Sequence, residues 1–228
     1  MYAHDEALSY LQHSLELLEE KKDHVEEKAR ISERLGYLKA WTGEFDAGIE
    51  CLKKSLTLWS QLGDKKNIAN LHVIMATWLW QLAGERNRAS EHHHMALEIL
   101  EKEPESVELA RLYEDISHML WRTGKSVDAL AWARKAFELA ERLDDPEVLV
   151  GCYNDLGALS SKSGEFEKAS KYYEQGLKIA LQNNVVGYAI NLYNNLSGLY
   201  GTSGEFQKRF KTAQKGSELA KKMVAYMA

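Results

Sequence analysis

Histidine and cysteine are the residues of this chain that most often bind metal ions, and their spacing decides whether they can do so here. His92, His93 and His94 are consecutive. On a helix three consecutive side chains point about 100° apart, so they cannot converge on one ion. We expect His93 instead to lie on the inward face of its helix, packed and hydrogen bonded. Cys51 and Cys152 have neither metal nor redox spacing, so we expect no metal site. They are about two and a half repeat lengths apart, so we also expect no disulfide. We expect no cofactor.

The sequence contains none of the common catalytic motifs. It has no HExxH pair, no GxSxG nucleophile elbow and no glycine-rich loop of the kind that cradles phosphate. His72 and His118 fall on separate predicted helices. The sequence therefore predicts no catalytic residue and no enzymatic activity.

Five glycines recur at a nearly constant interval and indicate that the chain is built from one repeated unit. They are separated by 41, 40, 40 and 40 residues and are Gly43, Gly84, Gly124, Gly164 and Gly204. A fixed interval of this size is typical of a solenoid, in which each unit packs on its neighbours. Each glycine lies between two helix-like apolar stretches. We expect it to end the first helix in a left-handed conformation before the chain reverses into the second.

Apolar residues recur at helical spacing before each glycine, and small residues such as Ala129 and Ala169 follow it where helices would cross. The pattern is carried by LGALSSKSGEFEKASKYYEQGLKIA at 156–180 and LGYLKAWTGEFDAGIECLKKSLTLW at 35–59. It resembles the tetratricopeptide repeat in a form longer than the usual unit of about 34 residues. The long-repeat relatives it looks like are kinesin light chains, spindle-orientation adaptors and arms of bacterial signalling proteins. The resemblance implies an all-α, right-handed superhelical solenoid of antiparallel helix pairs.

We expect a single solenoid domain over residues 1–228, with about five and a half repeats. Its predicted parts are the second helix of a partial repeat at 5–24 and repeats at roughly 25–63, 64–104, 105–145, 146–184 and 185–226. The missing first helix suggests a fragment of a longer protein, and a complete small protein with one capping helix is the alternative. Pro104 and Pro146 lie at joints between repeats, where Asp145 would cap the helix that Pro146 opens.

In tetratricopeptide arrays the first helices line a concave groove, so the resemblance places ligand-binding residues on these helices. Toward the N-terminus the predicted groove is apolar with charged edges. Its residues are Tyr37, Trp41, Leu71, Ile74, Trp78, Leu82 and Trp121, interleaved with charged residues that include Arg111, Glu114 and Arg122. Aromatic rings bury a large area at low entropy cost, so this zone would bind an amphipathic helix or a peptide with bulky side chains. The alternative is that some rings, such as Trp80, fill gaps between helices.

Toward the C-terminus the predicted groove is small and polar. Asn154, Asn194 and Asn195 precede the leucine of the motif by one or two residues. The resemblance implies that such asparagines hold peptide backbone, and an amide both donates and accepts, as an extended main chain requires. Asp155 stands where the next repeat has Asn195 and could attract a basic ligand, whereas Lys162 and the arginines would select acidic side chains. The alternative is that Asn154 and Asn194 hydrogen bond between adjacent repeats.

Composition and charge narrow the class of partner. With 45% hydrophobic and 28% charged residues, the chain is expected to fold and not to span a membrane. The net charge is -5 and the basic residues are spread along the chain, so no nucleic acid or membrane partner is expected. The chain opens without a secretory pattern, and we expect a cytoplasmic setting.

The leading interpretation is a protein–protein interaction module that binds a peptide or helical segment of a partner protein in the concave groove. One alternative is the sensor or coupling arm of a larger regulatory protein, such as a transcription regulator, nucleotide cyclase or signalling ATPase. Another is a self-associating scaffold, since a homo-oligomer is compatible with an exposed solenoid edge.

Overall fold

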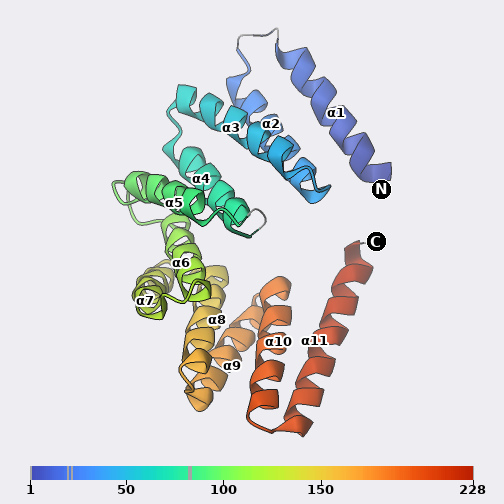
Figure 1. Cartoon of the computed structure of the whole chain (residues 1–228). Helices are drawn as coiled ribbons and strands as arrows, with labels where there is room; N and C mark the ends of the chain where they lie inside the picture. Colours follow the sequence, from blue (N-terminus) through green and yellow to red (C-terminus); the bar gives the residue numbers. More distant parts are fainter. Residues whose placement is uncertain (1, 20, 22, 82–83, 228) are drawn as a thin grey trace. The chain divides into compact units, whose positions relative to one another are not determined.

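The computed structural model describes residues 2–19, 21, 23–81 and 84–227, and over these residues the chain forms eleven α-helices and no strand (Figure 1). The helices are α1 (Tyr2–Glu19), α2 (Val25–Trp41), α3 (Phe45–Leu62), α4 (Lys65–Gln81), α5 (Arg86–Leu100), α6 (Val107–Arg122), α7 (Ser126–Leu143), α8 (Pro146–Lys162), α9 (Phe166–Gln182), α10 (Val186–Thr202) and α11 (Phe206–Met227). α1 is followed by five pairs in which each even-numbered helix packs on the next helix of the chain. The predicted all-α solenoid of helix pairs is confirmed.

The turn inside a helix pair is built on the recurring glycine, as predicted. At the end of α8, Gly164 has φ +79°, a left-handed conformation in which a residue without a Cβ is least strained. The N–H of Gly164 donates to the carbonyl of Ser161 at 3.1 Å, and that of Glu165 donates to Ser160 at 2.9 Å. These two bonds form a Schellman motif that satisfies carbonyls at the helix end.

The joints between pairs carry side-chain caps. Oδ1 of Asp145 accepts from the N–H of Val148 at 2.9 Å, and Pro146 begins α8, as predicted. Ser106 caps α6 through its hydroxyl oxygen, which accepts from the N–H of Leu109 at 3.3 Å. Each cap satisfies a backbone donor that has no partner within its helix.

The chain divides into two compact units, Met1–Pro104 and Glu105–Ala228. The first unit contains α1 to α5 and the second unit contains α6 to α11. The division falls at the predicted joint between the repeats at 64–104 and 105–145. In the first unit, α1 packs on α2 and α3 packs on α4, in addition to the contacts within each pair.

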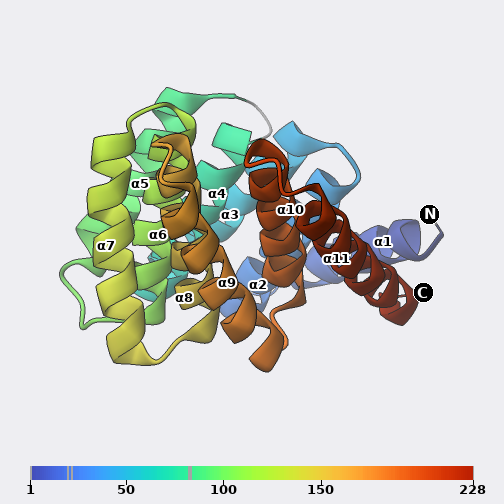
Figure 2. The same ribbon diagram turned by 90° about the horizontal axis from the view of Figure 1, so that it is seen from below.

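In the second unit the first helices of the pairs form an inner layer. α8 packs against both α6 and α10 as well as against its own partner, α9. The partner helices α7, α9 and α11 make no such contact with one another in the described part of this unit. α6, α8 and α10 therefore lie closer together than the outer helices do, which curves the unit toward them. Figure 2 shows α10 and α11 side by side at the end of this layer.

Small and aromatic residues fill the crossings between helices. On α8, Gly157 lies under the ring of the buried Tyr173 of α9: a Cβ added to this glycine would come 2.4 Å from Cε1 of the tyrosine. Other buried residues of this core are Val150, Ala169, Ala180, Ala189, Leu192, Leu196 and Leu199. The first unit has a core of its own, formed by Ala29, Leu52, Trp59, Leu71 and Met75.

The last helix, α11, is polar along most of its length, as expected for the end of a stack. Its exposed lysines are Lys208, Lys211, Lys215, Lys221 and Lys222. It also exposes the rings of Phe206 and Phe210. No helix in the described part of the chain is both long enough and apolar enough to cross a membrane.

Candidate functional site

A carboxylate is buried within the inner layer of the second unit. Asp155 on α8 is 0% exposed. Its Oδ1 lies 3.1 Å from Nδ1 of His118 on α6, which can donate a hydrogen bond to it. Its Oδ2 is buried without a hydrogen-bond partner. Because buried polar atoms are normally hydrogen bonded, this oxygen is an acceptor that the fold itself leaves unsatisfied.

A second carboxyl group, that of Glu114 on α6, lies beside it. A Cβ added to Gly151 on α8 would come 2.8 Å from Oε1 of Glu114 and 3.1 Å from the hydroxyl of Tyr188 on α10, so the three helices converge here. Burial raises the pKa of Glu114 well above its ordinary value, and the neighbouring charge of Asp155 raises it further. Arg111 opposes this shift. Glu114 therefore retains its proton to a higher pH than an exposed glutamate would.

The neighbouring Cys152 and Tyr188 are also held in their neutral forms. Burial raises the pKa of the Cys152 thiol above its ordinary value, and the charges of Glu114 and Asp155 add to the effect. The charge of Glu114 is the main cause of the raised pKa of Tyr188, followed by burial. A thiol held neutral is a poor nucleophile, so the arrangement does not favour covalent chemistry at Cys152.

Two of the predicted asparagines meet one repeat further along the same layer. Nδ2 of Asn195 on α10 donates to Oδ1 of Asn154 on α8 at 2.7 Å. Asn194 is exposed and does not share this bond: a Cβ added to Gly216 on α11 would lie 3.9 Å from its Oδ1. The hydrogen bond between repeats therefore joins Asn154 to Asn195, not to Asn194.

The predicted basic residues lie on the inner helices α6 and α8, and Arg122 and Lys162 are at the helix ends. Nη2 of Arg111 lies 2.6 Å from Oε2 of Glu147, with both side chains about half exposed. Nζ of Lys162 lies 3.4 Å from the main-chain oxygen of Trp121, and Arg122 is exposed. These cations therefore lie on α6 and α8, and of the three only Arg111 acts on the pKa of Glu114.

The other predicted aromatic residues lie on α2 and α4 of the first unit. Tyr37 and Trp78 pack edge to face with ring centroids 5.5 Å apart. Trp41 is 77% exposed, whereas Ile74 and Trp78 are partly buried against the core. Trp41 is thus the most accessible of these anchors, and Trp78 combines packing with a partly exposed surface.

The sequence also predicts two leucines, Leu71 and Leu82, in this apolar zone. Leu71 is 0% exposed and belongs to the core, where it lies in the same buried cluster as Leu52 and Trp59 of α3. Leu82 lies outside the described residues. A pocket of about 300 Å³ does open beside Trp78, lined also by Phe45, Asp46, Ile49, Glu50, Lys53, Leu79, Glu85 and Arg88.

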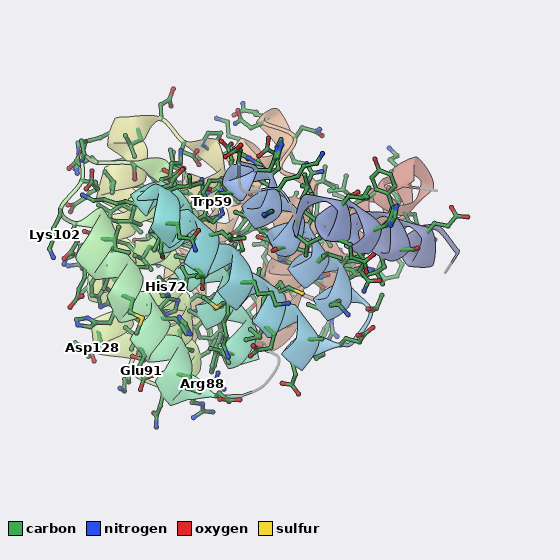
Figure 3. All side chains as sticks on the ribbon, turned by 90° about the horizontal axis from the view of Figure 1, so that it is seen from above. Trp59, His72, Arg88, Glu91, Lys102 and Asp128 are labelled. Atoms are coloured by element: carbon green, nitrogen blue, oxygen red, sulfur yellow. The ribbon has the colours of Figure 1, made fainter. Side chains whose placement is uncertain are left out.

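Three histidines of α4 and α5 form a pair and a separate buried ring. His72 on α4 is labelled in Figure 3, and its Nδ1 lies 2.8 Å from Nδ1 of His92 on α5. His93 is buried, as predicted, but its expected hydrogen bond is absent, since neither ring nitrogen has a partner. Burial lowers the pKa of both His72 and His93 to about 4. Over the described residues there is no group of three or more side chains able to hold a metal ion.

The meeting of Glu114 with Asp155 is the feature that sequence reasoning missed. In the sequence, Asp155 stands where the next repeat has an asparagine, and Glu114 is one of the charged residues interleaved with the apolar zone. The signal was present in their spacing: the two residues are 41 apart, as are Asn154 and Asn195. Both pairs use the same two positions of consecutive repeats.

The helix pairs and the inner layer define the class of helical repeat proteins, and the sequence identifies the family within that class. The chain belongs to the tetratricopeptide repeat family, whose sequence profile matches residues 27–102 and 108–182. No match was found among curated proteins.

Solved structures support the same fold at low sequence identity. BtubC from P. vanneervenii superposes with a TM-score of 0.77 at 20% identity, covering 97% of this chain and 92% of its own. A signal transduction ATPase from Pyrococcus horikoshii with a tetratricopeptide repeat sensor gives 0.69 at 19%, covering 89% and 31%. A Rap protein complexed with competence and sporulation factor gives 0.65 at 15%, covering 98% and 72%. At these identities the likeness shows the fold alone.

Proposed function

We propose that this chain is a protein–protein interaction module whose inner layer in the second unit, formed by α6, α8 and α10, binds a segment of a partner protein. Tetratricopeptide repeats are typically interaction modules and not enzymes. The structure of a Rap protein complexed with competence and sporulation factor supports a ligand-binding role for this fold. The proposal is independent of which partner is bound.

The observation that carries the proposal is the polar character of the inner layer. Helices that only packed against one another would bury apolar side chains, yet this layer contains the unsatisfied Oδ2 of Asp155 and the amide pair of Asn154 and Asn195. Each of these amides keeps further donor and acceptor capacity for a peptide main chain. Arg111 on α6 and Lys162 at the end of α8 add positive charge to the layer.

The remaining predicted residues have subordinate roles in the proposal. Arg122 adds a further positive charge beside Trp121 at the end of α6, and Asn194 would contact only the edge of a bound segment. In the first unit, Tyr37, Trp41, Ile74 and Trp78 would offer apolar anchors to bulky side chains of a partner that binds to that unit.

The experiment that tests the proposal is site-specific photocrosslinking in the source cell. A benzophenone amino acid replaces Lys162 on α8 in one variant and Lys171 on the outer helix α9 in a control, both being exposed lysines of the same pair. We expect a partner to be crosslinked from residue 162 and not from residue 171. Crosslinking from residue 171 alone, or equally from both positions, would contradict the proposal.

A second candidate function is that of a sensor arm within a larger regulatory protein. It is favoured by the structural likeness to the tetratricopeptide repeat sensor of the Pyrococcus horikoshii ATPase. In that case the residue crosslinked from position 162 would lie in another domain of the same polypeptide. Self-association is favoured only by the exposed phenylalanines of α11, and sedimentation velocity would detect it as a mass that rises with concentration.

A further inference from the structure

The carboxyls of Glu114 and Asp155 occupy the positions that the amides of Asn154 and Asn195 occupy one repeat later. Both pairs are 41 residues apart and join one inner helix to the next. The amide pair closes with a hydrogen bond of 2.7 Å, because one amide donates and the other accepts. Two carboxylates only accept, so the acidic pair cannot close in this way unless one of them is protonated.

The surroundings of the acidic pair leave its charge poorly compensated. Around it lie Arg111, Asp115 and His118 on α6, Glu147 and Cys152 on α8, and Tyr188 on α10. Arg111 forms an ion pair with the exposed Glu147 at 2.6 Å, which offsets part of its positive charge. Of the two carboxylate oxygens of Asp155, His118 reaches only Oδ1. The charge of Asp155 raises the pKa of Glu114, so the two carboxylates repel each other when both are charged, and a cation between them would relieve that repulsion.

We propose that Glu114 and Asp155 form a receptor for one cationic side chain, an arginine or a lysine, of the bound partner segment. This inference rests on the proposed function and names the chemistry that the partner must carry. The buried Oδ2 of Asp155 points to a ligand independently of the cluster of acids, because nothing within the fold satisfies it. The amide pair beside the receptor would hold main chain next to the cationic residue.

Binding at this receptor exchanges a proton for a cation. Because the pKa of Glu114 is raised, the free protein holds a proton there at a pH where an exposed glutamate has lost it. When the cationic side chain enters, Glu114 releases that proton to the solvent and its carboxyl becomes charged. Affinity for a cationic segment therefore increases with pH through the titration of Glu114 and levels off above it.

The test uses the full chain and three tripeptide probes: acetyl-Ala-Arg-Ala-amide, its lysine counterpart, and a neutral version in which citrulline replaces arginine. Binding is followed by NMR of protein labelled with ¹³C at the side-chain carboxyls. We expect a cationic peptide to shift the signals of Glu114 and Asp155, and the citrulline peptide to bind about tenfold more weakly. The arginine and lysine probes distinguish the two sources of positive charge.

Matched variants separate this receptor from a general effect of charge. Glu114→Gln should weaken binding of the cationic peptide about tenfold and remove its pH dependence. Glu167→Gln removes the same charge from an exposed position on α9 and should leave the affinity unchanged. Circular dichroism would establish that the variants are equally helical, and Asp155→Asn serves as a second receptor variant.

Equal affinity for the arginine and citrulline peptides would overturn the inference, as would equal affinity of the parent and Glu114→Gln, or no binding of either cationic peptide. Photocrosslinking from residue 162 does not depend on Glu114. A partner crosslinked there, together with probes that show no preference for positive charge, would therefore support the proposed function and remove its cation receptor.

Discussion

His93 is a buried imidazole whose two nitrogens make no hydrogen bond, so it weakens the first unit. Leucine has a similar volume and carries no polar atom that needs a partner. We expect His93→Leu to be more stable than the parent by about 1 kcal/mol at pH 7, because the unsatisfied nitrogens are removed. In a calorimetric melt this corresponds to an increase in Tm of about 2–4 °C.

The matched control for this change is His94→Leu. His94 is exposed and follows His93 on the same helix, so its replacement should leave Tm within error of the parent. If His93→Leu melts at or below the parent temperature, the imidazole makes a stabilising contact that outweighs its unsatisfied nitrogens.

At the residue scale the sequence predicted burial better than it predicted partners. Helical spacing was enough to place His93 inward, and the asparagine alternative correctly included a bond between repeats. The pairing of Asn154 with Asn195, and the meeting of Glu114 with Asp155, depend on how far one inner helix is rotated and shifted against the next. A linear pattern does not specify that rotation, although the shared 41-residue spacing links the two pairs once one of them is known.

At the element scale two glycines of the inner helices should respond oppositely to alanine. A Cβ at Gly157 on α8 would come 2.4 Å from the ring of Tyr173, which is buried and cannot easily move away. A Cβ at Gly198 on α10 would meet no other atom within 4 Å. We expect Gly157→Ala to destabilise the protein by about 1–3 kcal/mol through overpacking, and Gly198→Ala to stabilise it by about 1 kcal/mol through helix propensity.

Urea unfolding followed by circular dichroism measures both changes on the same scale. The two variants control for each other, since each adds one methyl group to an inner helix of the second unit. Stabilisation by both would mean that α8 and α9 can separate at their crossing without cost. That result would contradict the role of small residues in bringing the helices of a pair close together.

The elements themselves were largely predictable from the sequence. The recurring glycines located the turn of each pair because the left-handed helix end requires a residue without a Cβ, and Gly164 shows this geometry. The cap by Asp145 followed from its place before Pro146. The inner layer was expected only through the family resemblance, since helix periodicity shows which face is buried but not which neighbour covers it.

On the scale of the whole molecule, the repeats gather into two units, a division that their uniform spacing did not indicate. The units contain buried groups with opposite pKa shifts. In the first unit, burial lowers the pKa of His93 from 6.5 to about 4. Protonation of His93 therefore favours unfolding, and the free energy of unfolding decreases as the pH falls from 6.5 toward 4. In the second unit, the pKa of Glu114 is raised above 4.5. The contribution of Glu114 to the free energy of unfolding therefore decreases as the pH rises from 4.5 through that raised pKa.

Hydrogen exchange of the full chain at pH 5 and pH 7, corrected for intrinsic exchange rates, should therefore show opposite changes in the two units. Protonation of His93 alone should make the opening free energy of α4 and α5 lower at pH 5 than at pH 7, by an amount on the order of 2 kcal/mol. The opening free energy of α6 and α8 should instead be higher at pH 5, where Glu114 holds its proton to a larger extent than at pH 7. His93→Leu should reduce the first change and Glu114→Gln the second, each leaving the other unit unaffected. Opening free energies that change together in both units would show that the chain unfolds as one cooperative body, and would contradict an independent titration of each unit.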